Sequence, residues 1–387
     1  MIRFLTAGES HGKSLVGILE GMPAGLEISE EEIARDLKRR QQGYGRSERM
    51  KIEQDRAEIL SGVRYGVTLG SPIALQIENK DWPNWSSQMR ADAPPDSERA
   101  APLTSPRPGH ADYAGAIKYH HRDIRNVIER SSARETAMRV ALGAICRKFL
   151  REFGITVGSH VVRIGAAVST QDVSAIAPEQ ISQRADQSPV HSLDKKAERE
   201  MIGIIDEAKT QGDTVGGVFE VIVAGLPVGL GSYVHYDRRL DGILAQAMMS
   251  IHAMKAVGFG LAEETAQHFG SEVHDRMFPS SGGAERRTNN AGGTEGGMSN
   301  GEPLRIRVAM KPLSTLGQPL ESVDMATGEP VVALRERSDV CAVPAAAIIG
   351  EAMAMLALMN PFLEKFGGDS IKEIKAHVVA APPSPWA

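Results

Sequence analysis

Apolar residues recur at helical spacing in several segments of the chain. Ser29 and Glu32 have the spacing of a capping box, so a helix is expected to begin there and to run to about Arg40. A second capping box at Ser132 precedes apolar residues spaced three or four apart up to Phe149. Further helices are expected over residues 197–208 and 240–251 and after Pro344, since proline suits a first helical turn.

Alternation of apolar with polar or small residues marks the expected strands. It is clearest over residues 304–310 and recurs at 73–77, and residues 156–166 and 216–226 also have strand character. Helices and strands alternate without a simple repeat and without an interdomain linker. We therefore expect an α+β or mixed α/β fold in one domain, residues 1–387, with a mobile Pro-rich tail at about 381–387.

Two long segments follow neither period. Residues 90–109 are rich in Pro, Ser and charged residues, which predicts an extended surface loop. Residues 279–301 are rich in glycine, and structureless stretches of this length in compact domains are usually functional or disordered.

The composition narrows the class of protein. Apolar residues make up 42% of the 387 positions, enough for a large core, and the formal net charge is −5. This charge argues against nucleic acid or an acidic membrane as the main partner, so an anionic ligand must be bound by local arginine clusters. Cys146 and Cys341 lack metal-ligand spacing, no segment approaches the roughly 20 apolar residues of a membrane span, and no leader is evident. We expect a soluble cytoplasmic protein without a metal.

Two histidines lie in glycine-bearing loops. His11 lies within Gly8–Gly12, and His110 follows Gly109 at the end of the Pro-rich run. Small neighbours give an imidazole little packing from its own segment, so it can meet a ligand, and imidazole titrates near neutral pH. Two such sites suggest proton chemistry on a bound small molecule.

Candidate anion sites lie in an arginine-rich segment and at an expected helix start. Four arginines surround the glycine turn at residues 43–45 and could present several guanidinium groups to one phosphate or carboxylate: Arg39, Arg40, Arg46 and Arg49. A solvated basic face is the alternative. Residues 130–136 are expected to open a helix whose free N–H groups could bind a phosphate, unless Ser132 only caps it.

Three further segments place polar groups near the ends of expected elements. The glycine-rich residues 289–298 could let the backbone approach a planar ligand, with a flexible linker as the alternative. Residues 311–315 follow the clearest strand, and residues 337–339 precede the last long helix. Each of these alone would more often be structural than functional.

Together these segments resemble the chorismate synthase family. Seven motifs occur in the family's order: GESHG at 8–12, RRQQGYGR at 39–46, GHAD at 109–112, RSSARET at 130–136, AGGTEGG at 291–297, KPLST at 311–315 and RSD at 337–339. A single motif would be weak, but seven in order over nearly the whole chain are specific. The length is similar to that of the monofunctional bacterial form, and no flavin-reductase region is evident.

The resemblance implies an unusual lyase. The family converts 5-enolpyruvylshikimate 3-phosphate to chorismate and phosphate by an anti 1,4-elimination that needs reduced FMN although no net redox change occurs. The implied fold is a β-α-β sandwich of chorismate synthase type, in which sheets enclose helices, assembled as a homotetramer. An external flavin reductase is implied as a partner, with NADPH as one candidate reductant of the flavin.

The resemblance also assigns roles to residues. His11 is the implied general acid at the phosphate, His110 the proton donor to the flavin, and Asp339 the group that assists proton transfer at flavin N5. The implied flavin contacts are Arg130, Ser131, Ser132, His252, Ala253, Gly296, Lys311, Pro312, Leu313, Ser314, Thr315 and Arg337. Arg49 and Arg134 would bind substrate, and Arg40 and Arg46 would bind NADP(H) or substrate. The sequence departs from the family at His252, where Asn is commoner.

Two other functions stay open on the residues alone. A flavin oxidoreductase that uses NADPH on a small anionic substrate would give net substrate oxidation. A non-catalytic flavin- or nucleotide-binding module would bind its ligand without dependence on His11 or His110.

Overall fold

The N-terminal part of the chain forms a four-stranded antiparallel sheet. In this computed structural model, which describes residues 1–47, 53–95, 97, 99–280 and 283–382, its strand order is β1-β2-β6-β3. The bounds are β1 Arg3–Ala7, β2 Ser14–Glu20, β3 Ala57–Ser61 and β6 Ile73–Glu78. The alternation expected at 73–77 is confirmed, because Ile73, Leu75 and Ile77 are buried and the residues between them less so.

A second antiparallel sheet has five strands in the order β10-β15-β9-β7-β8. The bounds are β7 Thr156–Ile164, β8 Ala167–Val168, β9 Gly217–Ala224, β10 Met254–Phe259 and β15 Leu304–Met310. In β15 every second residue from Leu304 is buried, and Ile306 lies opposite Val221 of β9. The expected strand at 304–310 is therefore confirmed, and its alternate side chains form part of the core.

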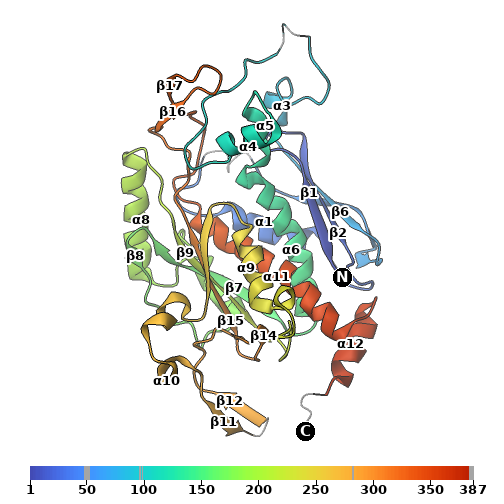
Figure 1. Cartoon of the computed structure of the whole chain (residues 1–387). Helices are drawn as coiled ribbons and strands as arrows, with labels where there is room; N and C mark the ends of the chain where they lie inside the picture. The colour runs from blue at the N-terminus through green and yellow to red at the C-terminus, as the bar shows by residue number, and fades with distance from the viewer. Residues whose placement is uncertain (48–52, 96, 98, 281–282, 383–387) are drawn as a thin grey trace.

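Helices fill the space between the two sheets (Figure 1). α1 (Glu30–Gln41) contacts β3, and α6 (Thr136–Arg151) contacts β2 and β6. α11 (Val343–Phe366) contacts β7 and β9, α9 (Leu240–Met249) contacts β10, and α6 packs directly on α11. The expected α+β sandwich with sheets enclosing helices is confirmed. One hydrophobic cluster includes residues of both sheets and of the helices between them. A single domain over residues 1–387 stays a prediction.

The two central helices approach each other where a side chain is absent. A Cβ at Gly143 of α6 would lie 2.5 Å from the Cβ of Ala352 in α11. Two Ala-rich helices can therefore pack this closely only because residue 143 is glycine.

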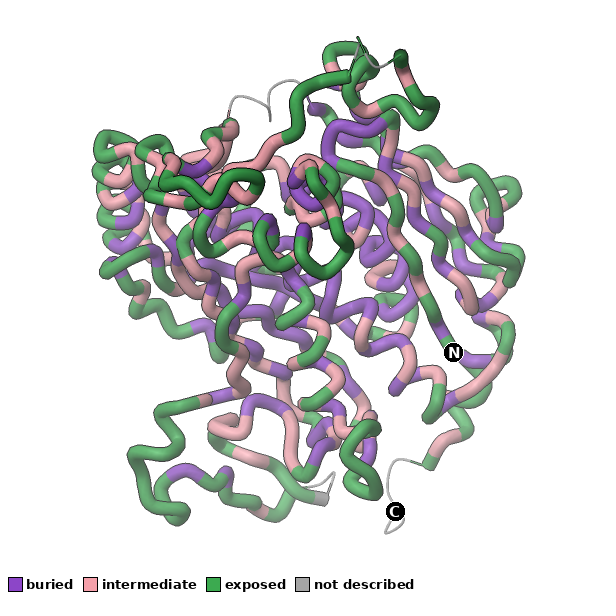
Figure 2. Tube along the Cα trace, turned by 45° about the horizontal axis from the view of Figure 1, so that its top comes forward, coloured by how far each residue is buried: buried purple, intermediate pink, exposed green. Residues whose placement is uncertain are grey.

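The long C-terminal helix is a core helix. Among the described residues, α11 is the one helix long and apolar enough to cross a membrane. Of its most apolar stretch, 83% is buried inside the protein. The expectation that no segment approaches a membrane span is wrong on length and composition. α11 packs on β7 and β9 of one sheet and on the helices α1, α6 and α9, which explains why most of its residues are apolar and buried. Figure 2 shows buried residues gathered in the interior of the molecule.

A buried carboxylate interrupts this apolar helix. Glu351 of α11 is fully buried and accepts hydrogen bonds from Arg39 (2.7 and 3.0 Å), Arg147 (2.5 Å), Ser159 (2.7 Å) and Ser182 (3.0 Å). Burial alone would raise the pKa of Glu351, but the two arginines and the hydrogen bonds outweigh burial and hold that pKa well below its usual range.

The remaining described elements are short or lie outside the sandwich. The strands are β4 Val63–Arg64, β5 Val67–Thr68, β11 Met277–Ser280, β12 Gly283–Arg286, β13 Thr294–Glu295, β14 Met298–Ser299, β16 Glu321–Val323 and β17 Pro330–Val332. The helices are α3 Trp82–Trp85, α4 Asp112–Tyr119, α5 Arg125–Arg130, α7 Pro178–Ala185, α8 Lys195–Thr210, α10 Gly270–Val273 and α12 Ile371–Ala380, with 3₁₀ turns at Ala133–Glu135, Tyr236–Arg238 and Ala262–Gln267.

Several sequence expectations need correction. The glycine-rich segment 279–301 is not structureless, because it contributes to the hairpins β11–β12 and β13–β14. Ser132 caps a 3₁₀ turn, and α6 begins only at Thr136, so residues 130–136 do not open an α-helix directly. The helix expected over 240–251 ends at Met249. Most of the tail expected to be mobile, residues 383–387, lies outside the described residues.

Candidate functional site

A cavity of about 440 Å³ brings together segments from the whole length of the chain. Most predicted site residues line it: His11, Arg40, Arg46, His110, Ser131, Ser132, Arg134, His252, Ala253, Lys311, Pro312, Leu313, Ser314, Thr315, Arg337 and Asp339. One wall is apolar, made by Ala342, Ala345, Ala346 and Ile349 at the start of α11, together with Met310. A cavity with one apolar wall and convergent polar groups suits a planar ligand that also carries charge.

His11 is buried against an acidic partner. The glycine turn before it is needed, because Gly8 has φ +104° and a Cβ there would lie 2.4 Å from the carbonyl oxygen of Ser14. The ring Nδ1 of His11 lies 3.0 Å from Oε1 of Glu129, and the ring stacks on Trp85 with centroids 4.0 Å apart. His11 therefore lines the cavity but is more enclosed than its small neighbours in sequence suggest.

His110 has a similar acidic partner two residues further along the GHAD motif. Its Nδ1 lies 2.5 Å from Oδ1 of Asp112, and Arg107 donates to the two oxygens of this carboxylate from Nε (2.8 Å) and Nη2 (3.1 Å). Although burial alone would raise the pKa of Asp112, its hydrogen bonds to His110 and Arg107 hold that pKa well below its usual range. A carboxylate that stays ionised can orient His110 at its Nδ1.

The arginines of residues 39–46 divide between two environments. Arg39 is directed into the core, where it binds Glu351 and Asp186, so it does not belong to the expected anion cluster. Arg40 and Arg46 line the cavity, and Arg46 lies 3.4 Å from Asp339. Arg49 lies outside the described residues.

Arg40 has one hydrogen-bond donor at the cavity that no described residue uses. Its Nη2 and Nε groups donate to Thr136 Oγ1 (2.9 and 3.1 Å), but its buried Nη1 has no hydrogen-bond acceptor among the described residues; the carboxylate of Asp55 is 3.8 Å away. Burial lowers the pKa of Arg40 to about 10. A phosphate or carboxylate oxygen in the cavity would satisfy this donor.

Arg134 lines the cavity but is already paired within the protein. Its guanidinium donates to Asp55 (2.6 and 2.7 Å) and to Asn79 (3.0 Å). A substrate contact for this residue stays a prediction, and in this structure Arg134 compensates the charge of Asp55 beside Arg40.

His252 follows α9 instead of lying on it. α9 ends at Met249, and Ala253, with a left-handed φ of 67°, directly precedes β10. Burial, partly offset by Glu135, lowers the pKa of His252 to about 4, and its buried Nδ1 has no hydrogen-bond partner among the described residues. A neutral imidazole with an unused polar atom at a cavity wall suits hydrogen bonding to a ligand.

Residues 311–315 follow β15 as expected and form an edge of the cavity. The Lys311 Nζ group donates to the carbonyl oxygen of Gly109, which ties this segment to the His110 loop. Burial, with a smaller effect of Lys255, lowers the pKa of Lys311.

Two predicted flavin contacts lie elsewhere. Arg130 is exposed and donates to the carbonyl oxygens of Thr6 (2.7 Å) and Gly8 (3.0 Å), so it holds the loop that carries His11. Gly296 lies at the tip of the β13–β14 hairpin and is not among the described residues that line this cavity. Direct flavin contacts for both residues stay predictions.

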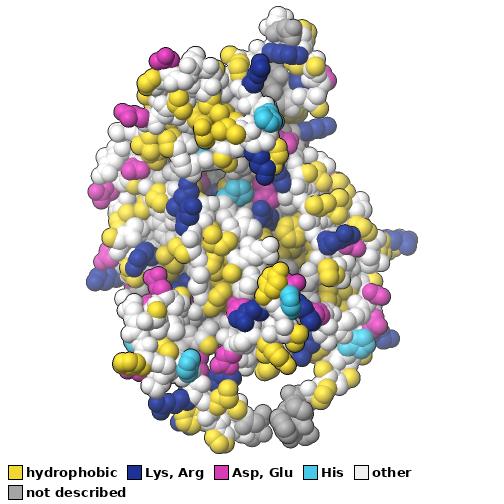
Figure 3. All heavy atoms as spheres, viewed as in Figure 1, with side chains coloured by type: hydrophobic (Ala, Val, Ile, Leu, Met, Phe, Trp, Pro, Cys, Tyr) yellow, Lys and Arg dark blue, Asp and Glu magenta, His cyan; other side chains and the backbone are white. Residues whose placement is uncertain are grey.

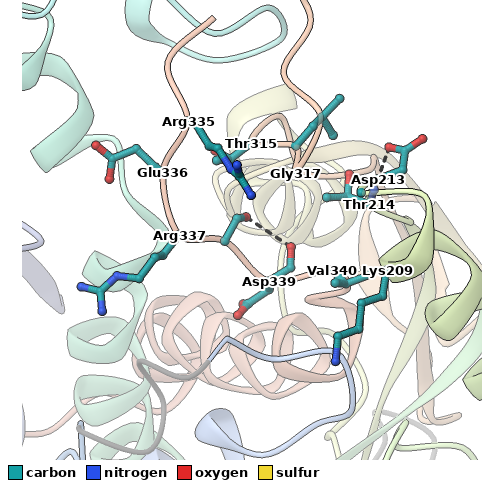
Figure 4. Close-up of a pocket in the computed structure, with 13 residues that line it drawn as sticks. Lys209, Asp213, Thr214, Thr315, Gly317, Arg335, Glu336, Arg337, Asp339 and Val340 are labelled. Atoms are coloured by element: carbon teal, nitrogen blue, oxygen red, sulfur yellow. Dashed lines mark hydrogen bonds between the residues drawn. The ribbon is translucent and has the colours of Figure 1, made fainter.

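A second pocket of about 460 Å³ shares the 336–339 segment with the cavity. Figure 4 shows Arg335, Lys209 and Asp339 around it, with Asp213 hydrogen-bonded to the backbone N–H of Thr214. The segment that carries Asp339 therefore faces two hollows.

Among the described residues, the surface around the site has no large region of one charge on the face shown in Figure 3. On the face shown in Figure 3, Lys and Arg side chains are interspersed with Asp and Glu. The cationic groups that could bind an anion are therefore those of the cavity itself, as the net charge led us to expect.

Glu129, Arg107, Arg125 and Trp85 had no predicted role, and Asp112 was noted only as part of the GHAD motif. The proximity of Arg107 and Asp112 to His110 in the chain was an available signal. No local pattern connects Glu129 with His11, 118 residues away.

Comparison with known proteins gives consistent results. A sequence model of the chorismate synthase family matches residues 2–363. The chain is 56% identical over 383 residues to the chorismate synthase of Pelobacter propionicus, covering 97% of both chains. It is 55% identical over 381 residues to that of Aquifex aeolicus, covering 97% of this chain and 96% of the relative. A crystal structure of chorismate synthase is similar with a TM-score of 0.78 and 46% identity, covering 98% of this chain and 96% of the other.

Proposed function

The chain belongs to the chorismate synthase family, and from this premise we propose how its cavity carries out the family's reaction. Chorismate synthases are carbon–oxygen lyases that convert 5-enolpyruvylshikimate 3-phosphate to chorismate and phosphate, the last common step of the shikimate pathway to aromatic amino acids. They depend on reduced flavin. The chain is an enzyme of this kind, which sets aside the two alternatives of an oxidoreductase and a binding module.

The residues of the cavity fit a reduced flavin, which we take to be FMN. The apolar wall at the start of α11 can accept a ring system, and the unpartnered Nδ1 of His252 offers a polar contact in the same cavity. The residues that would hold the flavin are Ser131, Ser132, His252, Ala253, Lys311, Pro312, Leu313, Ser314, Thr315 and Arg337. When bound, the reduced flavin supplies electron density to the substrate as the phosphate leaves.

Two histidines and two arginines carry the rest of the proposal. Arg40 and Arg46 bind anionic groups of the substrate or of NADP(H), and Arg40 Nη1 offers a buried donor to such a group. His11 donates a proton to the leaving phosphate, and His110 supplies a proton at the flavin, with Asp339 assisting at N5. The observation that carries the proposal is that both histidines line one cavity and that each has a buried carboxylate at its Nδ1.

The cellular setting follows from the same proposal. We expect a cytoplasmic homotetramer that receives reduced FMN from an external flavin reductase, with NADPH as one candidate reductant of the flavin. Neither a nucleic acid nor a membrane is expected as a partner.

An anaerobic assay tests the proposed function. Chorismate and phosphate should form in equal amounts from 5-enolpyruvylshikimate 3-phosphate with dithionite-reduced FMN, and not with oxidised FMN. Reduced FAD and NADPH with oxidised FMN, assayed separately, identify the flavin and the reductant. Full turnover without any flavin, or net oxidation of the substrate, would refute the proposal.

A further inference from the structure

We propose that Glu129 is the positioning residue that fixes the tautomer of His11 and supplies the counter-charge for its protonated form, from which it donates to the leaving phosphate. This inference rests on the proposed role of His11. It concerns a residue that does not itself reach the substrate, because Glu129 is fully buried behind the histidine.

Glu129 holds both the backbone and the ring of His11. Its Oε2 accepts the backbone N–H of His11 at 2.8 Å, and its two oxygens lie 3.0 and 3.1 Å from His11 Nδ1. The carbonyl oxygen of Glu129 also accepts the N–H of Ser10 at 2.9 Å. These contacts from one residue fix the loop and the ring as a unit, while Trp85 covers the ring face.

The tautomer follows from these contacts. An ionised carboxylate can only accept, so Nδ1 must carry the proton and Nε2 becomes the ring nitrogen that exchanges a proton within the cavity. Burial alone would raise the pKa of Glu129, but its hydrogen bond and charge interaction with His11 outweigh burial and lower it. Glu129 therefore stays ionised when the reaction takes place near neutral pH.

The charge of Glu129 is only partly compensated by other groups. The cationic Arg125 lies 3.3 Å away, but Arg125 lies closer to Glu336 (2.8 Å) and also contacts the Trp85 ring. Asp112 behind His110 is different, because Arg107 donates to both of its oxygens at 2.8 and 3.1 Å. Glu129 therefore retains more of its negative charge for His11 than Asp112 does for His110.

The other charged groups around His11 do not replace Glu129. Arg40, Arg46 and Arg134 line the same cavity and disfavour a second positive charge, while Asp339 is engaged by Arg46. Arg337 and Asp81 pair beside α3. A positive imidazolium in this arginine-rich cavity needs a dedicated counter-charge, and Glu129 supplies it in direct contact with the ring.

The test compares Glu129→Gln with Asp112→Asn. Glutamine keeps the size and one acceptor oxygen but removes the charge. Histidine C2–H exchange, measured for each histidine by mass spectrometry across pH, gives the protonation midpoint without turnover. In Glu129→Gln the His11 midpoint should fall by about one pH unit or more, and in Asp112→Asn it should stay in place while that of His110 moves.

Activity supplies a second measurement. Single-turnover phosphate release at pH 7 should slow about tenfold or more in Glu129→Gln, which is less than the roughly 10²–10⁴ expected for loss of the acid itself. In the pH–rate profile of this variant, the decline at high pH should begin at a lower pH than in the parent. Glu129→Asp should lie between the parent and the Gln variant. If Glu129→Gln does not fold, Glu129→Asp provides the test. Its side chain is one methylene shorter, so its carboxylate is further from His11, and both the His11 midpoint and the rate of phosphate release should still change.

An unchanged His11 midpoint in a folded Gln variant, or parent-like values for both measurements in the Asp variant, would overturn the proposal. If the parent releases no phosphate with reduced FMN, the proposed function fails. The exchange measurement would then still decide whether Glu129 controls the protonation of His11.

Discussion

Replacement of Glu351 by glutamine should strongly destabilise the core. The side chain is fully buried and serves four partners, Arg39, Arg147, Ser159 and Ser182. Glutamine would place an NH₂ group against guanidinium donors and would leave two half-buried arginines, Arg39 and Arg147, short of a counter-charge. Removing one partner of a buried ion pair costs about 3–5 kcal/mol.

The lower end of that range applies here because other carboxylates remain. Asp186 stays 2.8 Å from Arg39, and Asp36 stays 3.1 Å from Arg147. We therefore expect a loss of about 3 kcal/mol in the free energy of unfolding at pH 7. With a urea m-value of about 3 kcal/mol/M, the midpoint should fall by about 1 M.

The loss should depend on pH with a defined sign. The pKa of Glu351 is depressed in the folded state, so its carboxylate stabilises the protein above the unfolded value of 4.5, and this contribution disappears as the pH falls further. The difference between parent and Glu351→Gln should be constant above about pH 5.5 and should shrink below about pH 4.5.

Asp186→Asn provides the matched control. Asp186 binds the same arginine, but its side chain is 29% exposed and burial raises its pKa, so its ionised form is not strongly stabilised. Asp186→Asn should therefore lower the free energy of unfolding by less than about 1 kcal/mol. A stability deficit in Glu351→Gln as small as that of the control, or one that persists unchanged at low pH, would refute the reasoning.

Three further predictions concern the site. His11→Ala and His110→Ala should each slow single-turnover phosphate release by about 10²–10⁴, with melting curves checking that the fold is retained. Arg46→Ala should weaken substrate binding by about 10- to 100-fold and Arg46→Lys should recover only part of it, because a point charge lacks the guanidinium fork; isothermal titration with substrate and with NADP(H) separately would show which anion is affected. Gly8→Ala should destabilise the protein by about 1–3 kcal/mol in urea, because a Cβ would lie 2.4 Å from the carbonyl oxygen of Ser14, and unchanged stability would show that the turn can relax.

Elements with a clear period and local start signals could be predicted from the sequence. Ser29 caps α1 by accepting the N–H of Glu32, as expected, and β15 buries alternate residues. β1 and β10 could not be predicted in this way, because β1 has no fully buried position among its described residues and only Met254 is fully buried in β10. Their strand structure depends on pairing with β2 and β15.

Most predicted site residues line one cavity, although Arg130 and Gly296 do not, and the contacts within the cavity were not predicted. Arg39 and Arg40 are neighbours at the end of one helix, yet one binds Glu351 and the other lines the cavity. Successive helical residues are directed about 100° apart, and their partners come from distant parts of the chain, so sequence spacing could not separate them. For the same reason the enclosure of His11 by Glu129 and Trp85 was not foreseen.

The position of α11 has a consequence for biosynthesis. The ribosome makes the strands of both sheets before it makes residues 343–366. By then α1 and α6 can already cover the N-terminal sheet, but the faces of β7 and β9 that α11 covers are still open. Asn360 of α11 also holds the start of the chain next to β1, because its Oδ1 accepts the N–H of Ile2 at 2.6 Å. The earliest and latest parts of the chain must therefore meet before the structure closes, which makes nascent chains that end before α11 natural clients of chaperones and proteases.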